Sequence, residues 1–275
     1  MDEIVWRGMT RAQLDAAYNN SAAVKNSAEK LAEWQQRSKR MRAERNELLD
    51  LPYGPRPRNK VDIFRCGRAG APLLAYIHGG YWHRNAKEFY ACLAEGPLAR
   101  GIDTALIGYT LAPEATLTEI VEEARAALRW LRAKGPRHGV AAAKLIVSGW
   151  SAGGHLTAMA LADADAGLAI SGIFDIEPCR LNYLNEKLNM SLEEQVLLSP
   201  IRQLPPRSPP LIIAYGAVEL PELQRQSRDY HAARGAAGLP SELLVLEGHD
   251  HFSILEELAS PTGQLTSAVV RLVRD

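Results

Sequence analysis

Short apolar runs alternate with helix-like segments along most of the chain, and this alternation constrains the fold more than any other feature. Each run has the length of a strand buried on both faces, and helical periodicity follows most of the runs. Strands are expected at 61–66, 73–77, 104–107, 144–148, 168–171, 211–215 and 243–246. Helices are expected at 117–133, 151–161, 222–234 and 252–259. Such alternation predicts the α/β class, with a mostly parallel sheet and helices on both faces.

Two segments fall outside this alternation. Residues 10–50 are predicted to be helical, and residues 1–50 are expected to form an N-terminal helical cap. Apolar side chains of that stretch share one helical stripe: Leu31, Trp34, Met41 and Leu48. Residues 175–210 are rich in proline and contain no clear strand, so they are interpreted as a lid-like insertion over the sheet edge. The whole chain, 1–275, is expected to be one domain.

Charge and composition exclude several classes of protein. The chain has 32 basic and 32 acidic residues, so its net charge gives no field that would hold nucleic acid. No apolar stretch reaches the roughly 18 residues of a membrane span, and no apolar signal sequence follows the acidic start. We therefore expect a cytoplasmic protein without nucleic-acid or membrane partners.

The cysteines and the known ligand motifs predict neither a disulfide framework nor a cofactor. Cys66, Cys92 and Cys179 are odd in number and lack C-x-x-C spacing, so they are expected to act as small buried apolar residues. The chain contains no H-E-x-x-H, P-loop or G-x-G-x-x-G motif. No metal and no cofactor are therefore expected.

A nucleophile motif lies between an expected strand and an expected helix. Gly149-Trp150-Ser151-Ala152-Gly153 matches G-x-S-x-G, and the strand at 144–148 leads directly into it. Glycines allow the backbone to turn sharply there, which would leave the Ser151 hydroxyl exposed above the sheet. The sequence therefore predicts Ser151 as the nucleophile of an acyl-transfer reaction.

A second loop, His78-Gly79-Gly80-Tyr81-Trp82, follows the strand at 73–77. Small residues there allow backbone N–H groups to bind the oxyanion of a tetrahedral intermediate. The predicted donors are the amides of Gly79, Gly80, Tyr81 and Ala152. His78 is expected to order the loop by hydrogen bonding rather than to titrate in catalysis.

Aromatic residues near these motifs are candidates for substrate contact. Tyr81, Trp82 and His83 are expected to form an aromatic wall for an aryl substrate, with packing in the core as the alternative. Trp150, inside the nucleophile motif, is a further substrate-binding candidate.

The general base must lie on a loop after a late strand in order to reach the sheet edge that carries Ser151. His251 is the preferred residue and His249 is the alternative.

The acid that orients the base should follow the strand at 211–215. Glu219 is the preferred acid, and Glu222 and Asp175 remain alternatives. The 32 residues from Glu219 to His251 suffice for one helix and one strand, which would return the histidine to the same edge.

Taken together, the motifs resemble a known superfamily. Four of them agree in order: residues 78–82, Tyr109-Thr110-Leu111-Ala112-Pro113-Glu114, residues 149–155 and residues 248–252. They resemble the α/β-hydrolases, in the hormone-sensitive-lipase-like branch, and the order Ser, acid, His is the order of that superfamily. The H-G-G-x-W form with Trp82, and the N-terminal Tyr18-Asn19 and Trp34, are similar to the arylformamidase (kynurenine formamidase) family. The resemblance covers about residues 14–260.

This resemblance implies a fold, an activity and a set of roles. It implies an α/β-hydrolase that converts N-formylkynurenine to kynurenine and formate in tryptophan catabolism, with Ser151 as nucleophile, His251 as base and the H-G-G loop as oxyanion hole. Members of the group are often dimers, so a homodimer is one option. The family's acid is usually Asp, and Glu219 departs from that pattern.

The expected activity is therefore that of a cofactor-free serine hydrolase acting on a small aryl formamide. The alternative is a carboxylesterase or a carbamate or amide hydrolase with the same machinery. A non-catalytic binding protein on this fold is a third hypothesis, which the presence of both Ser151 and His251 disfavours.

Overall fold

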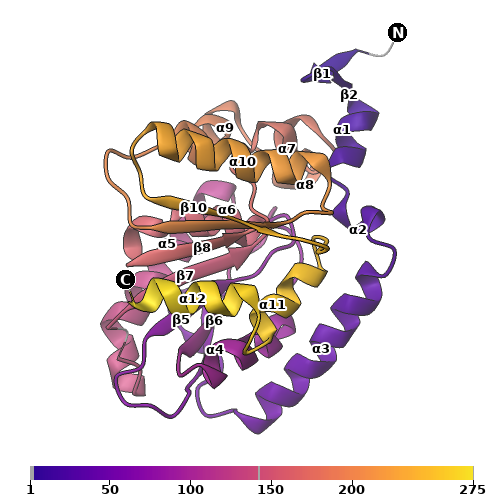
Figure 1. Cartoon of the computed structure of the whole chain (residues 1–275). Coiled ribbons are helices and arrows are strands. Elements are labelled where there is room, and N and C mark those ends of the chain that lie inside the picture. The colour runs from indigo at the N-terminus through magenta and orange to yellow at the C-terminus, as the bar shows by residue number, and fades with distance from the viewer. Residues whose placement is uncertain (1–2, 142, 275) are drawn as a thin grey trace.

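The computed structural model describes residues 3–141 and 143–274 and is built around an eight-stranded sheet (Figure 1). The strands are β3 (Leu51–Pro52), β4 (Lys60–Phe64), β5 (Leu73–Ile77), β6 (Asp103–Ile107), β7 (Leu145–Trp150), β8 (Ala166–Ile170), β9 (Leu211–Gly216) and β10 (Ser241–Leu246). A separate ribbon pairs β1 (Ile4–Trp6) with β2 (Met9–Thr10). Each apolar run that predicted a strand forms one, so the predicted α/β class is confirmed.

The order of the strands, β10-β9-β8-β7-β5-β6-β4-β3, locates the site. All neighbours from β10 to β6 are parallel, and β4 and β3 join antiparallel at one edge. The chain runs from β5 to β6 on one side of β5 and then crosses back to β7 on the other side. The connections from the neighbouring strands β5 and β6 therefore run in opposite directions along the sheet. Ligands of open α/β sheets bind at such a point, beyond the carboxyl ends of the strands. Ile77, which directly precedes the loop at 78–82, pairs there with Gly149, the first residue of the nucleophile motif.

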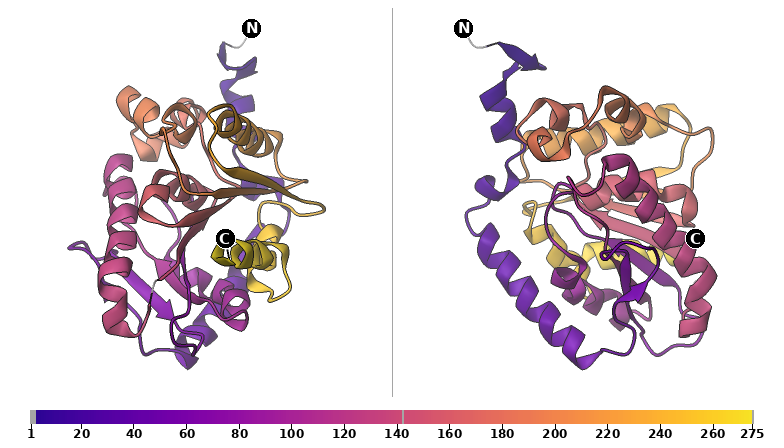
Figure 2. Two further views of the ribbon diagram at one scale, coloured as in Figure 1. Left: turned by 60° about the vertical axis from the view of Figure 1, so that its left-hand side comes forward. Right: turned by 180° about the vertical axis from the view of Figure 1, so that it is seen from behind.

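Helices cover both faces of the sheet (Figure 2). The longer ones are α3 (Ser27–Glu44), α5 (Leu117–Lys134), α6 (Ala152–Met159), α10 (Pro221–Ala236) and α12 (Gln264–Arg274). The shorter ones are α1 (Arg11–Ala17), α2 (Asn20–Ala23), α4 (Glu95–Ala99), α7 (Glu177–Leu181), α8 (Asn185–Leu188), α9 (Leu192–Leu197) and α11 (Glu256–Ala259). 3-10 helices occur at Lys87–Ala94, Gly135–His138, Leu161–Asp163, Pro200–Arg202 and Ser253–Leu255.

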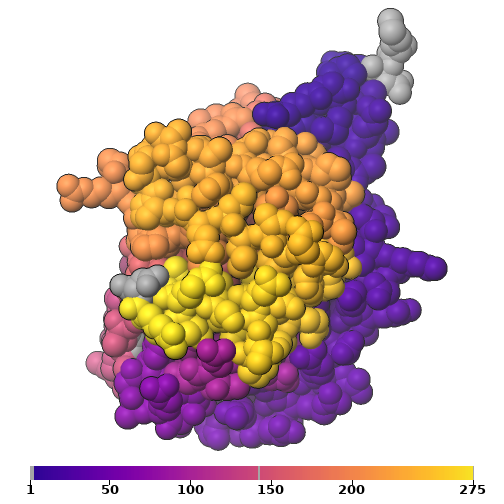
Figure 3. Space-filling model, viewed as in Figure 1, coloured from indigo at the N-terminus to yellow at the C-terminus, as the bar shows by residue number. Residues whose placement is uncertain are grey.

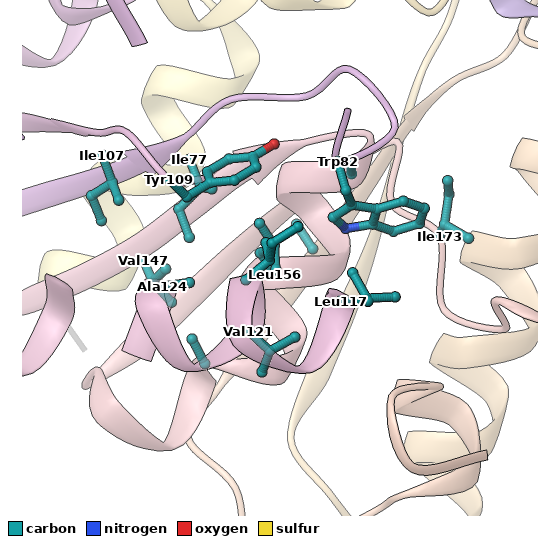
Figure 4. Close-up of a cluster of buried hydrophobic side chains, with 14 of the residues drawn as sticks. Ile77, Trp82, Ile107, Tyr109, Leu117, Val121, Ala124, Val147, Leu156 and Ile173 are labelled. Atoms are coloured by element: carbon teal, nitrogen blue, oxygen red, sulfur yellow. The ribbon is translucent and has the colours of Figure 1, made fainter. Parts of the chain in front are cut away.

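Two hydrophobic clusters, one on each face, hold these layers together. In β5, Leu73 and Ile77 enter one cluster while Leu74 and Tyr76 enter the other, as the alternation of side chains along a strand requires. The first cluster contains side chains of α5, α6 and α10, and part of it is drawn in Figure 4. The second contains side chains of α3, α11 and α12.

The N-terminal segment differs from the single helical stretch predicted for residues 10–50. It forms α1, α2 and α3, and α3 ends at Glu44. Trp34 and Met41 enter the cluster on one face of the sheet, whereas Leu48 lies beyond the helix and packs against the cluster on the other face. The backbone causes this difference, because the Leu48 carbonyl accepts a hydrogen bond from the amide of Ile63 in β4 (2.8 Å), at the sheet edge.

The segment 175–210 contains no strand, as predicted, and forms α7, α8, α9 and a 3-10 turn. Its apolar residues, among them Leu184, Leu188 and Leu198, pack against the cluster that contains α6. Its last residues lead to the amino end of β9, at the edge of the sheet opposite the two motifs.

Two further expectations concern the cysteines and the membrane. All three cysteines are free, and Cys92 and Cys179 are buried while Cys66 is half-buried. Among the described residues, no helix combines the length and the apolarity that crossing a bilayer requires.

Candidate active site

Ser151 occupies a sharp turn between β7 and α6. Its backbone has φ of 59° and ψ of −117°, a conformation that costs a non-glycine residue on the order of 1–3 kcal/mol. The turn is tight, because a Cβ on Gly149 would lie 2.3 Å from the carbonyl oxygen of Gly153. A hydrogen bond from the Ser151 amide to the Ile170 carbonyl (2.8 Å) fixes the turn to the neighbouring strand. The strand, turn and helix expected around Ser151 are therefore present.

Glu219 and His251 meet beyond the carboxyl ends of β9 and β10. The Nδ1–H of His251 donates to Oε2 of Glu219 at 2.8 Å, and both side chains are buried. The helix α10 connects the two parallel strands, and this crossover returns His251 to the edge that carries Glu219. The pair has the geometry by which a carboxylate fixes the tautomer of a general base.

The second carboxylate oxygen of Glu219 is also occupied. Its Oε1 accepts hydrogen bonds from the Ser171 hydroxyl (2.6 Å) and from the Gly216 amide (2.7 Å). Because Gly216 lies only three residues before Glu219, the longer side chain folds back over the end of β9. Because the side chain folds back, a Glu can occupy the position at which the arylformamidase family usually has Asp.

Ser171 was not predicted as a site residue, although its position at the end of a predicted strand could have indicated it. It ends the strand predicted at 168–171, and β8 is the direct neighbour of β9. A hydroxyl at the carboxyl end of that strand therefore had to lie close to the predicted acid.

The alternatives for acid and base are bound elsewhere. Glu222 forms an ion pair with Arg225 (2.8 Å), and Asp175 forms one with Arg202 (3.1 Å). His249 lies 3.5 Å from Glu257. The structure thus brings Glu219, and neither Glu222 nor Asp175, to His251.

Ser151 and His251 line one small cavity of about 60 Å³. Its other lining residues are Asn20, Ser21, Leu31, Gly80, Tyr81, Arg84, Asn85, Trp150 and Phe252. In the described part of the chain, no hydrogen bond joins the Ser151 hydroxyl to the His251 ring, a bond that in many hydrolases tightens only when substrate binds.

The N-terminal segment forms one wall of this cavity, whereas the segment 175–210 contributes none of the described lining residues. In Figure 3 the N-terminal segment, in indigo, lies along one side of the molecule next to the orange and yellow C-terminal part.

The H-G-G loop lies against the predicted nucleophile, Ser151. A Cβ on Gly79 would lie 2.7 Å from the Trp150 carbonyl oxygen and 3.0 Å from the Cβ of Ser151. The next three residues have positive φ, namely 115° at Gly80, 48° at Tyr81 and 58° at Trp82. Among the described residues, the amides of Gly79, Gly80, Tyr81 and Ala152 bind no acceptor. These amides are therefore free to donate to an oxyanion.

His78 orders this loop, as predicted. Its Nδ1–H donates to the Gly79 carbonyl (2.8 Å), and its ring stacks against Tyr109 with 4.3 Å between the ring centroids. Burial lowers the pKa of His78 to about 4, so the ring is neutral near pH 7.

The structure corrects the expected aromatic wall. Trp82 is fully buried, its indole N–H donates to His155 Nδ1 (3.2 Å), and its ring lies near Leu117 and Ile173 in the core (Figure 4). A buried indole N–H requires an acceptor, and the one available to Trp82 lies on α6, inside the core. His83 is also absent from the described cavity wall.

Tyr81 and Trp150 are the candidates that do line the cavity. The Trp150 indole N–H donates to the His251 carbonyl (2.7 Å), and the two rings lie 4.8 Å apart.

Trp34 joins the N-terminal segment to the His251 loop. Its ring stacks on Phe252 with 6.3 Å between the centroids and meets Trp150 edge-on at 6.1 Å. Its N–H donates to Glu256 at 2.6 Å. The helix α3 therefore supports two residues that flank the predicted base and nucleophile.

Comparison with known proteins connects this geometry to a family. The family model BD-FAE matches residues 62–170. The kynurenine formamidase of Danio rerio is 27% identical over 296 residues, which cover 98% of each chain.

Two solved structures share the fold. A proposed thioesterase from a Silicibacter species superimposes with a TM-score of 0.83 at 26% identity and covers 94% of this chain and 99% of its own. The thermostable carboxylesterase EstE1 gives 0.71 at 18% identity and covers 92% of this chain and 98% of its own. The order of the strands, the order of the motifs and these likenesses show that the chain is an arylformamidase-like member of the α/β-hydrolase superfamily, a hydrolase of small substrates.

Proposed function

We propose that the chain is a cofactor-free serine hydrolase that cleaves a small aryl formamide of the N-formylkynurenine type through a formyl-enzyme. The observation that carries this proposal is the strained turn at Ser151 beside the buried His251–Glu219 pair. The likeness to a kynurenine formamidase over nearly the whole chain supports the choice of substrate class.

In the proposed reaction, His251 removes the proton of Ser151 while Oγ attacks the formyl carbon. Free amides of the H-G-G loop and of Ala152 bind the resulting oxyanion. The intermediate then collapses, the C–N bond breaks and His251 gives its proton to the leaving arylamine. A water molecule, deprotonated by His251, attacks the formyl ester, and formate leaves as Ser151 regains its proton.

The size and charge of the cavity favour such a substrate. A formyl group carries only hydrogen on its carbonyl carbon, so it fits a cavity of about 60 Å³ better than a long acyl chain does. Arg84 is the only permanently charged side chain among the described residues that line the cavity. Its guanidinium suits the carboxylate of an amino-acid substrate such as N-formylkynurenine.

The test compares kcat/KM for N-formylkynurenine with kcat/KM for p-nitrophenyl acetate and butyrate, with Ser151→Ala as the control. A value of about 10⁴ M⁻¹s⁻¹ or more for the formamide, above both esters and lost in Ser151→Ala, supports the proposal. Turnover of the esters alone would favour a carboxylesterase instead. Activity that persists in Ser151→Ala would contradict the assignment of the nucleophile.

A further inference from the structure

Asn20, in the short helix α2, is a polar residue of the cavity wall that the proposed mechanism does not use. It is 4% exposed and lines the cavity together with Ser151 and His251. It also lines a second cavity, of about 390 Å³, on whose wall Glu219 and His251 lie. Asn20 therefore borders two cavities that adjoin the predicted base.

The hydrogen bonds around Asn20 determine the orientation of its amide. The Tyr81 hydroxyl has one proton and donates it to the Tyr18 carbonyl (2.5 Å), which can only accept. The contact of 2.9 Å between Asn20 and the Tyr81 oxygen must then be a donation from Nδ2 of Asn20. The amide is thus held with Nδ2 toward Tyr81 and Oδ1 directed elsewhere.

Within the described part of the chain, the Oδ1 of Asn20 is buried and has no hydrogen-bond partner. A buried acceptor without a donor is unfavourable and therefore uncommon in folded proteins. A carbonyl oxygen fixed in this way, on a residue that lines one cavity with the predicted catalytic serine, is an acceptor prepared for a ligand that brings its own N–H.

We propose that Oδ1 of Asn20 accepts a hydrogen bond from the N–H of the scissile amide and thereby makes the site selective for amides over esters. This inference rests on the proposed function. As the C–N bond breaks, the nitrogen lone pair must face the imidazolium of His251, so the N–H must point to a different acceptor. An ester oxygen carries no hydrogen and gains nothing from Asn20.

A matched pair of substrates tests this assignment. Formanilide and phenyl formate share the formyl and phenyl groups and differ only in N–H against O at the scissile bond. We expect Asn20→Ala to lower kcat/KM for formanilide at least tenfold and to change kcat/KM for phenyl formate less than threefold. The retained ester activity would show that the variant is folded. Gln35→Ala, which removes an exposed amide from α3, is the control and should change neither value.

Equal losses on both substrates would mean that Asn20 only positions Tyr81, and no loss on either would mean that Oδ1 binds nothing. Both outcomes overturn the inference. If the wild-type chain cleaves phenyl formate but no formamide, the proposed function fails. The role of Asn20 is then tested by how strongly formamides inhibit the hydrolysis of phenyl formate. Formanilide should then inhibit ester hydrolysis more strongly than N-methylformanilide, which lacks the N–H, and Asn20→Ala should abolish that difference. Equal inhibition of the wild type by the two compounds would also overturn it.

Discussion

At the scale of the single residue, the hydrogen bonds of Glu219 define what a substitution there must do. One carboxylate oxygen accepts hydrogen bonds from Ser171 and Gly216, and the other accepts a hydrogen bond from His251. The Gly216 amide can only donate. An amide in place of the carboxylate would therefore keep its oxygen toward Gly216 and turn its NH₂ group toward His251.

Glu219→Gln should therefore abolish most of the activity without unfolding the chain. Its NH₂ group would force the proton of His251 onto Nε2, the nitrogen that accepts the proton of Ser151 in the proposed mechanism. We expect kcat to fall by about 10³–10⁴-fold, as it does when the acid of a serine protease is replaced by its amide. Steady-state kinetics would measure the loss. Glu222→Gln is the matched control, and a larger loss there than at Glu219 would contradict the assignment of the acid.

Two buried histidines connect stability to pH. The Nε2–H of His155 donates to the Leu198 carbonyl (2.7 Å) and its Nδ1 accepts from Trp82, so a proton added at Nδ1 would break the hydrogen bond from Trp82. Burial lowers the pKa of His155 to about 4, as it does for His78. Because these pKa values are depressed from 6.5, the unfolded chain binds more protons between pH 6.5 and pH 4. The contribution of the two neutral histidines to the free energy of unfolding should therefore be fully present above pH 6.5 and should be lost as the pH falls toward 4.

Urea unfolding at pH 7.0, 5.5 and 4.5 would measure this effect. Each of the two histidines should contribute on the order of 3 kcal/mol to the decrease over the whole range. In His155→Gln, an amide can make both hydrogen bonds without titrating, so the free energy of unfolding should depend less on pH. His138→Gln, which replaces a half-buried histidine, should match the wild type. An unchanged pH dependence in His155→Gln would count against the proposed cause.

At the scale of the element, Trp34 packs α3 against Phe252 in the His251 loop. Trp34→Ala removes a fully buried indole from Phe252 and Trp150, and such a truncation costs about 3–5 kcal/mol. Trp34→Phe keeps the aromatic contacts and loses the hydrogen bond to Glu256, which should cost about 1.5–3 kcal/mol. Urea unfolding at pH 7 would measure both. Equal costs for the two variants would contradict a stabilisation that rests on ring packing.

The sequence predicts elements best where burial dominates. The central strands are apolar at nearly every position, so their runs predicted them within about two residues. The N-terminal helices carry weaker patterns, because α2 is a single turn and α3 has one buried side only. The helix α12 went unpredicted although its apolar face packs against the sheet.

At the scale of the whole molecule, the predictable part of the candidate site is the part that sits on strand ends. Ser151, Glu219 and His251 each follow a strand of the parallel sheet, so chain order and topology bring them to one edge. Asn20 follows no strand. It is held at the cavity by its hydrogen bond to Tyr81, and its segment is held by Tyr18 and Trp34, which contact residues more than 200 positions away in the sequence. A local pattern carries no information about such a contact.

That long separation also has a consequence in time. A ribosome releases α3 with Trp34 exposed long before it makes Glu256 and Phe252, to which that indole binds. At about 5–20 residues per second, the 222 residues between Trp34 and Glu256 correspond to a delay of about 10–40 s. Residues 87–94, which also pack on α3, are made much earlier, so the surface that stays uncovered for that period is the part of Trp34 that contacts Phe252 and Glu256. That surface is open to chaperones and to other nascent chains. The hydrolase therefore acquires its activity late, when residues 252–256 pack against α3.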